Sequence, residues 1–237
     1  RNNTMANILM VVSAANSLTM RDGTEHPTGF WAEELVVSHQ TLLDAGHTVH
    51  IATPGGRKPT VDEVSFAAES AGGQDRADSF RAYLAEIDAE LSAPLALADV
   101  DPSGYDAVVL PGGHGPMTDL YQDADLGKIL VAANTAGTII APFCHGPAGL
   151  LSATDDAGTF AFAGRRLTVF TNEEELGGGT GPNTPWFVED VLRDKGAVVE
   201  NAAAWSSHVV RDGNLISGQN PQSSEDVAQE VLKALAG

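Results

Sequence analysis

The chain has 237 residues, of which 43% are hydrophobic and 19% charged, as expected for one large globular domain or two small ones. Its net charge of −19 argues against binding to nucleic-acid phosphates, and no apolar stretch is long enough to span a membrane. The same charge is expected of a solvated acidic surface, and the lone cysteine cannot form an internal disulfide, so a cytoplasmic protein is the default expectation. Residues 1–5 lack the apolar core of a signal peptide, and Met5 is a candidate natural start, with residues 1–4 as an added leader.

The first half of the chain alternates strand and helix patterns. The predicted elements are, in order, a buried strand at 7–13, a polar loop at 14–28, an amphipathic helix at 30–45 and a second strand at 48–53. Strand, helix and strand at this spacing form a βαβ unit, which favours a parallel sheet. Residues 57–98 interrupt the alternation with a charge-rich helical piece at about 77–92 and no evident strand. We therefore interpret 57–98 as a small helical insertion packed on the main domain.

The second half resumes the sheet. Its predicted elements are strands at 105–110, 138–143 and 166–170, helices at 123–136 and near 186–195, an acidic glycine-rich loop at 172–183, closing strands at 198–200, 207–210 and 215–218, and a last helix at 221–236. No internal repeat or flexible linker is evident, so we expect a single domain over 1–237. The predicted fold class is α/β, a doubly wound, mostly parallel sheet with helices on both faces.

Cys144 lies where a predicted strand ends abruptly and a run of small residues begins a predicted helix. This arrangement resembles a nucleophile elbow, with Gly146 two residues after the thiol, although Pro142 occupies the position two before it, where hydrolases prefer glycine. The alternative interpretation is a small buried hydrophobic residue. We favour a catalytic thiol, because a helix N-terminus would lower its pKa.

Three further loops should meet Cys144 at the carboxyl edge of the sheet, namely those after Ser13, Leu110 and Phe170. The loop at 111–115, Pro-Gly-Gly-His-Gly, has glycines that would let backbone N–H groups approach a ligand, as an oxyanion hole requires; its alternative is a plain tight turn. It lacks the spacing of dinucleotide and phosphate-binding loops.

Candidate acids and bases accompany the thiol. His145 could serve as its base at a sharp bend, oriented by a carboxylate from the acidic run at 172–175, although that run could equally be an exposed helix start. The helical pattern favours exposure of Glu33 and Glu34, whereas a buried Glu34 would have a raised pKa suited to proton transfer. The histidines are scattered, so we predict no metal site. The glycine run at 177–181 resembles a mobile lid.

Together these segments resemble a known family. The motifs are TGFWAEEL at 28–35, PGGHG at 111–115, CHGPA at 144–148, TVFTN at 168–172 with the glutamates after it, and SGQNP at 217–221. In this order, and over nearly the whole chain, they resemble the ThiJ/PfpI superfamily, in particular its glyoxalase III and heat-shock-chaperone branch. The resemblance implies a flavodoxin-like fold similar to class I glutamine amidotransferases. One departure is Val169, where relatives often carry glycine, which bears on local packing.

The resemblance also implies roles for site residues. Cys144 would be the nucleophile and His145 its partner. The third member falls on Glu175 by ungapped spacing, with Glu174 as the fallback, and Glu34 falls on the family's glutamate that contacts the cysteine.

The remaining implied roles concern binding. Gly113 and the backbone N–H of His145 would form the oxyanion site, and His114 and Glu174 would belong to the surrounding substrate-binding set.

The activity implied by this resemblance is that of a glyoxalase that needs neither metal, glutathione nor another cofactor. Its substrate would be a small α-oxoaldehyde such as methylglyoxal or glyoxal, converted to lactate or glycolate through a cysteine hemithioacetal. Alternatives are a holdase chaperone of the stress response, an oxidation-sensing protein, or a cysteine hydrolase of amides, isonitriles or peptides. Relatives often dimerise, so a homodimer is an option.

Overall fold

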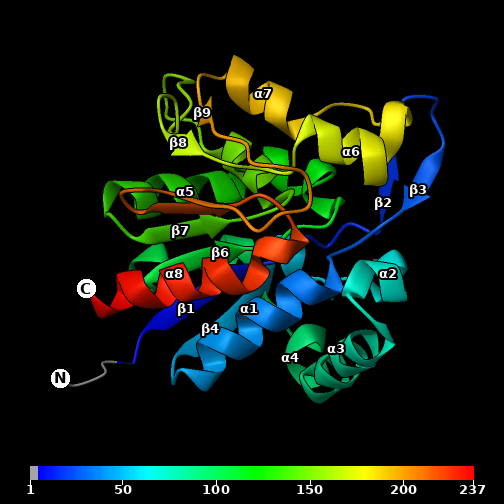
Figure 1. Ribbon diagram of the computed structural model, residues 1–237. Coiled ribbons are helices and arrows are strands. Elements are labelled where there is room, and N and C mark those ends of the chain that lie inside the picture. Colours follow the sequence, from blue (N-terminus) through cyan, green and yellow to red (C-terminus); the bar gives the residue numbers. More distant parts are fainter. Residues whose placement is uncertain (1–4) are drawn as a thin grey trace.

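The computed structural model describes residues 5–237, so the candidate leader at 1–4 lies outside the described residues. Its centre is a seven-stranded sheet with the strand order β10-β11-β7-β6-β1-β4-β5 (Figure 1). The strands are β1 (Asn7–Val11), β4 (Thr48–Thr53), β5 (Leu95–Ala96), β6 (Ala107–Leu110), β7 (Ile139–Pro142), β10 (Val209–Asp212) and β11 (Leu215–Gly218). All pairs are parallel except β10 with β11, so the predicted doubly wound, mostly parallel α/β fold is confirmed.

Helices cover both faces of this sheet. They are α1 (Ala32–Asp44), α2 (Ala68–Ala71), α3 (Gln74–Glu86), α4 (Asp88–Ser92), α5 (Ala124–Thr135), α6 (Asn172–Gly178), α7 (Val188–Asp194) and α8 (Ser224–Ala236). Helices α1 and α8 lie side by side on one face, and α5 lies on the other (Figure 1). None of the helices in residues 5–237 is long and apolar enough to cross a bilayer.

The apolar run of β1 is buried on both of its faces. Ile8 and Met10 belong to the hydrophobic cluster that includes residues of α1 and α8, whereas Leu9 and Val11 belong to the cluster that includes residues of α5. Because successive side chains point to opposite sides of a strand, a central strand between two helical layers is apolar at every position. This explains why 7–13 reads as a continuous hydrophobic segment.

The segment 57–98 is largely helical, as predicted, but it also contributes a strand. Helices α3 and α4 cover the predicted piece at 77–92, with a break at Ile87. The expectation of no strand here is wrong, because β5 pairs in parallel with β4 at the edge of the main sheet. A two-residue strand has no readable alternation. Phe66 and Phe80 anchor the segment in the apolar cluster that it shares with α1.

Two other local predictions, a loop and a strand, are corrected. The predicted loop at 14–28 contains a short hairpin of β2 (Ser17–Thr19) and β3 (Glu25–Pro27). The predicted strand at 166–170 is reduced to β8 (Arg166–Leu167), which pairs outside the main sheet with β9 (Val198–Val199). Beyond β8, the N–H of Thr168 donates to the hydroxyl of Ser217 rather than to a neighbouring strand.

The predicted acidic loop at 172–183 begins instead with a helix, α6, which includes two glycines of the expected lid. A capping box begins this helix: the Thr171 hydroxyl accepts from the N–H of Glu174, whose carboxylate accepts from the N–H of Thr171. The pattern Thr-x-x-Glu is a known sequence signal for a helix start, which was the alternative interpretation of the acidic run.

Candidate active site

Cys144 lies in a sharp turn at the carboxyl end of β7, with a φ of 58° that L-residues rarely adopt. Two backbone hydrogen bonds hold it there: its N–H donates to Gly218 and its carbonyl accepts from Phe170, each at 2.9 Å. A Cβ at Gly146 would lie 2.1 Å from the carbonyl oxygen of Leu110, so the turn requires glycine at that position. A 3₁₀ helix (Gly146–Ser152) follows the turn in place of the expected α-helix. The geometry is that of a nucleophile elbow.

His145 connects the thiol to a buried carboxylate. Its Nδ1 lies 3.4 Å from Cys144 Sγ, and its Nε2 lies 3.1 Å from Glu175 Oε1. Burial raises the pKa of Glu175, but the nearby imidazoles of His145 and His114 outweigh burial, so the pKa lies well below the usual range. An ionised Glu175 accepts the proton on Nε2 and leaves a lone pair on Nδ1 facing the sulfur. Burial, and then the neighbouring His114, lower the pKa of His145, which favours this neutral form.

Glu174 and Glu175 lie at the start of the same helix but have different surroundings. The Glu174 carboxylate is fully buried and accepts hydrogen bonds from the following groups: the N–H and hydroxyl of Thr171, the N–H of Trp205, and the side-chain amides of Gln219 and Asn220. This network ties α6 to the loops before β10 and after β11. It leaves Glu175, and not Glu174, against the imidazole of His145. The expected place of Glu174 in a substrate-binding set is not what the structure shows, because it does not line the cavity above the thiol.

Glu34 lies in the first turn of α1 and is fully buried, so the exposure favoured by the helical pattern is wrong. Its Oε1 accepts from the N–H of Gly112 at 2.7 Å, and its carboxyl interacts with the thiol of Cys144. Burial raises the pKa of Glu34 to about 8, so this carboxyl is protonated at neutral pH. Its neighbour Glu33 is buried as well and pairs with Arg76 of α3.

The thiol itself does not have the lowered pKa expected from a helix N-terminus. Burial raises the pKa of Cys144, and the adjacent Glu34 carboxyl raises it further, while the N–H of Gly113 lowers it. The helix expected to stabilise a thiolate is a short 3₁₀ helix. The resting sulfur is therefore a protonated thiol.

A cavity of about 320 Å³ opens above the sulfur. Its walls include the aromatic side chains of Trp31, Phe170 and Trp205, together with His145, Gly113 and other residues. Gly113 has a φ of 91°, and a Cβ there would lie 2.2 Å from the carbonyl oxygen of Gly29, so the loop requires glycine to bring its N–H toward the sulfur. A small number of polar groups in an otherwise apolar pocket is typical of a small-molecule site.

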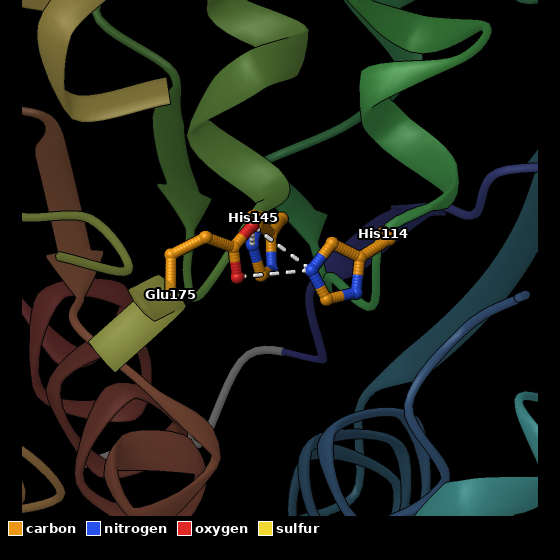
Figure 2. Close-up of side chains that lie close together, drawn as sticks. All are labelled: His114, His145 and Glu175. Carbon is orange, nitrogen blue, oxygen red and sulfur yellow. Dashed lines mark hydrogen bonds and ion pairs between the residues drawn. The ribbon is translucent and has the colours of Figure 1, made fainter. Parts of the chain in front are cut away.

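His114 is bound more closely into the site than its sequence position suggested. Its Nε2 lies 3.0 Å from both carboxylate oxygens of Glu175, and its ring centroid is 4.1 Å from that of His145. Figure 2 shows the two imidazoles converging on the same carboxylate. The expectation of scattered histidines fails here, because the fold brings two of them together from the ends of neighbouring strands.

The family model of the DJ-1/PfpI family matches residues 26–234. The chain belongs to this family. It is 26% identical to Glyoxalase 3 of Candida albicans over 97% of this chain and 98% of the relative. It is 27% identical to the glutathione-independent glyoxalase HSP31 of Saccharomyces cerevisiae, covering 96% and 97% of the two chains.

Two further comparisons agree with this membership. The chain is 28% identical to the protein/nucleic acid deglycase HchA of Pseudomonas aeruginosa, over 96% of this chain and 80% of the relative. The solved structure of glyoxalase III from Candida albicans matches with a TM-score of 0.79 at 25% identity, covering 97% of each chain. The resemblance to the ThiJ/PfpI superfamily and its glyoxalase III branch is thereby confirmed.

Proposed function

We propose that this protein is a glutathione-independent glyoxalase that converts methylglyoxal to lactate at Cys144. The observation that carries the proposal is the pair of groups beside the sulfur. One is a neutral imidazole, His145, whose Nδ1 lies 3.4 Å from the sulfur. The other is a carboxyl, Glu34, that keeps its proton at neutral pH. Membership of a family with relatives named glyoxalase supports the same conclusion.

In the first step, Nδ1 of His145 takes the thiol proton and the sulfur attacks the aldehyde carbon, forming a carbon–sulfur bond. The electron pair of the carbonyl moves to its oxygen. This oxyanion is stabilised by the N–H groups of Gly113 and His145 and is then protonated by Glu34 to give a hemithioacetal. Ionised Glu175 stabilises the imidazolium that forms on His145.

In the second step, Glu34 is a carboxylate and acts as the base. It removes the hydrogen from the former aldehyde carbon, while the imidazolium of His145 protonates the ketone oxygen, and an enediol results. Glu34 then returns its proton to the neighbouring carbon, and the hydroxyl on the sulfur-bearing carbon loses its proton to His145 and becomes the thioester carbonyl. The product is a lactoyl thioester on Cys144. Attack by water releases lactate and restores the thiol. The protein sulfur thus takes the role that glutathione plays in a two-substrate reaction.

The experiment is lactate formation from methylglyoxal in buffer free of glutathione, with wild type compared to Cys144→Ala. Wild type should form lactate in the presence of a metal chelator, and the variant should lose at least about a thousandfold in kcat/KM. Equal rates for the two proteins would overturn the proposal.

A second candidate is removal of methylglyoxal from glycated protein side chains. It is favoured by the cavity, which is larger than a three-carbon oxoaldehyde needs, and by the relative named as a deglycase. The test is the release of free amine from a lysine peptide glycated with methylglyoxal. A rate with the enzyme above the spontaneous rate would support this candidate.

The chaperone and hydrolase hypotheses stay predictions. Aggregation suppression that survives Cys144→Ala, together with negligible turnover, would favour the chaperone.

A further inference from the structure

Three buried side chains beside the thiol have the donor set of a metal site. They are His114, His145 and Glu175, and one ligand atom from each lies within 4.8 Å of the others (Figure 2). The proposed reaction needs only one of the two histidines as a base. We propose that these residues bind a divalent transition-metal ion that switches off Cys144. The inhibitory part of this proposal rests on the proposed function, whereas the binding part does not.

The donor chemistry selects the class of ion. Two imidazole nitrogens and one carboxylate oxygen suit borderline ions such as Fe²⁺, Co²⁺, Ni²⁺, Cu²⁺ and Zn²⁺, whereas Mg²⁺ and Ca²⁺ prefer sites made of oxygen. The three side chains are almost completely buried, so their positions are fixed by packing. The carboxylate of Glu175 would supply the negative charge of the ligand set.

The distances favour ligands at right angles. Nε2 of His114 lies 3.0 Å from the Glu175 oxygens, and Nε2 of His145 lies 3.1 Å from Oε1. With metal–ligand bonds of about 2.0–2.1 Å, ligands at 90° are separated by about 2.9 Å and tetrahedral ligands by about 3.3–3.4 Å. Both histidine–carboxylate separations therefore suit neighbouring ligands of an octahedral or tetragonal ion, and the ligand atoms of the two histidines lie within 4.8 Å of each other. A facial set of two histidines and one carboxylate is a known arrangement for such ions.

Metal binding at Nε2 of His145 would move the proton of the imidazole to its other nitrogen, Nδ1. In the metal-free site, Nε2 carries the proton, which it donates to Glu175, and Nδ1 faces Cys144 Sγ. A metal at Nε2 requires the lone pair of that atom, so the single proton of the neutral imidazole must move to Nδ1. Nδ1 then has no lone pair with which to accept the thiol proton. The metal inhibits without touching the sulfur.

The test measures metal binding by calorimetry with Ni²⁺ in a Cys144→Ala background, which removes the thiol as a ligand and needs no turnover. We expect one site per chain in Cys144→Ala and at least a hundredfold weaker binding after the further change His114→Gln. The matched control is His50→Gln in the same background, because His50 is an exposed histidine of β4 that contacts the hydroxyl of Tyr105 and is not one of the three ligands. This control should bind as Cys144→Ala does.

Two outcomes would overturn the proposal: no single site in Cys144→Ala, or equal affinity with and without His114. Should His114→Gln unfold the chain, Glu175→Gln provides a second variant with the same expected loss. In wild type, Ni²⁺ should inhibit lactate formation reversibly, with activity returning on addition of a chelator. Binding in Cys144→Ala without any glyoxalase activity in wild type would leave the metal site standing and reject the proposed function.

Discussion

Glu34 and Glu175 both lie beside the Cys144–His145 pair, yet their pKa values move in opposite directions. Glu34 is buried without a cation, and its pKa rises to about 8. Glu175 is also buried, but two imidazoles share it and its pKa falls below the usual range. One carboxyl is therefore an acid at neutral pH and the other an anion. Such a separation of two carboxyl groups by their surroundings is typical of acid–base catalysis.

The raised pKa of Glu34 predicts a pH-dependent stability difference between wild type and Glu34→Gln. Since folding raises this pKa from 4.5 to about 8, the stabilisation from the protonated carboxyl is fully present below pH 4.5 and is lost as the pH rises through 8. Gln has no such dependence. We expect the free energy of unfolding of Glu34→Gln, minus that of wild type, to increase by up to about 1.4 kcal/mol per pH unit between pH 5 and 8.

Urea unfolding at pH 5, 6, 7 and 8 measures this difference, and subtraction of wild type cancels the contributions of groups that the two proteins share. A difference that stays constant over this range would show that Glu34 titrates normally and is not the proton donor beside the sulfur.

The two adjacent glutamates of α6 should respond differently to the same substitution. Glu175→Gln removes the anion that orients His145, so kcat should fall by about 10²–10⁴. Every partner of the Glu174 carboxylate donates to it, so the amide N–H₂ that Glu174→Gln introduces would face other donors and leave some of them unpaired. The substitution should therefore lower the free energy of unfolding by about 2–4 kcal/mol. Steady-state kinetics and urea unfolding of both variants give the comparison. A large kcat loss confined to Glu174→Gln would contradict the assignment of Glu175 to the catalytic chain.

At the scale of elements, the segment 57–98 supports the cavity. It supplies Val64, Glu69 and Ser70 to the cavity wall, and Phe80 fixes α3 against α1. Phe80→Ala should therefore lower the free energy of unfolding by about 3–5 kcal/mol and raise KM. The control is Leu43→Ala on the outer side of α1, where the side chain is 43% exposed and the change should stay within about 0.5 kcal/mol. Denaturant unfolding and substrate titrations give both numbers. An unchanged stability in Phe80→Ala would mean that this segment is not anchored as described.

The long elements were predictable from the sequence and the short ones were not. The run at 7–13 and the periodic pattern at 30–45 gave β1 and α1 correctly, because burial between two layers requires apolar residues at those positions. Strands β5 and β8 have two residues each, too few for any pattern. Helix α6 did carry a signal, the Thr171–Glu174 capping box, which glycines in the same segment obscured.

Site residues that lie within the family motifs could be predicted from the sequence. The resemblance pointed to Cys144, His145 and Glu34, whereas the helical pattern alone placed Glu34 in solvent. Contacts such as that of His114 with Glu175 join residues from different strand ends, and only the folded chain brings them together. The raised pKa of the Cys144 thiol could not be predicted from the sequence either, because it depends on burial in the folded chain.

Across the whole molecule, the net charge of −19 is compatible with the proposed substrate. An acidic surface repels anions, but methylglyoxal is neutral and can reach the cavity without electrostatic cost. The same charge should destabilise the fold through self-repulsion, so we expect the Tm at pH 7.5 to rise as NaCl is increased from low salt to physiological ionic strength. Differential scanning calorimetry measures this shift, and KCl at equal ionic strength should give the same result. A Tm that falls with either salt would contradict this expectation.

In the proposed mechanism the substrate carbon becomes bonded to Cys144 and is rearranged there. Acid quenching of wild type during turnover of methylglyoxal, followed by peptide mass spectrometry, tests it most directly. We expect a lactoyl group on the peptide that contains Cys144 in wild type, and neither that group nor lactate in Cys144→Ala. Steady formation of lactate by Cys144→Ala at the wild-type rate, with wild-type Cys144 never acylated, would contradict it.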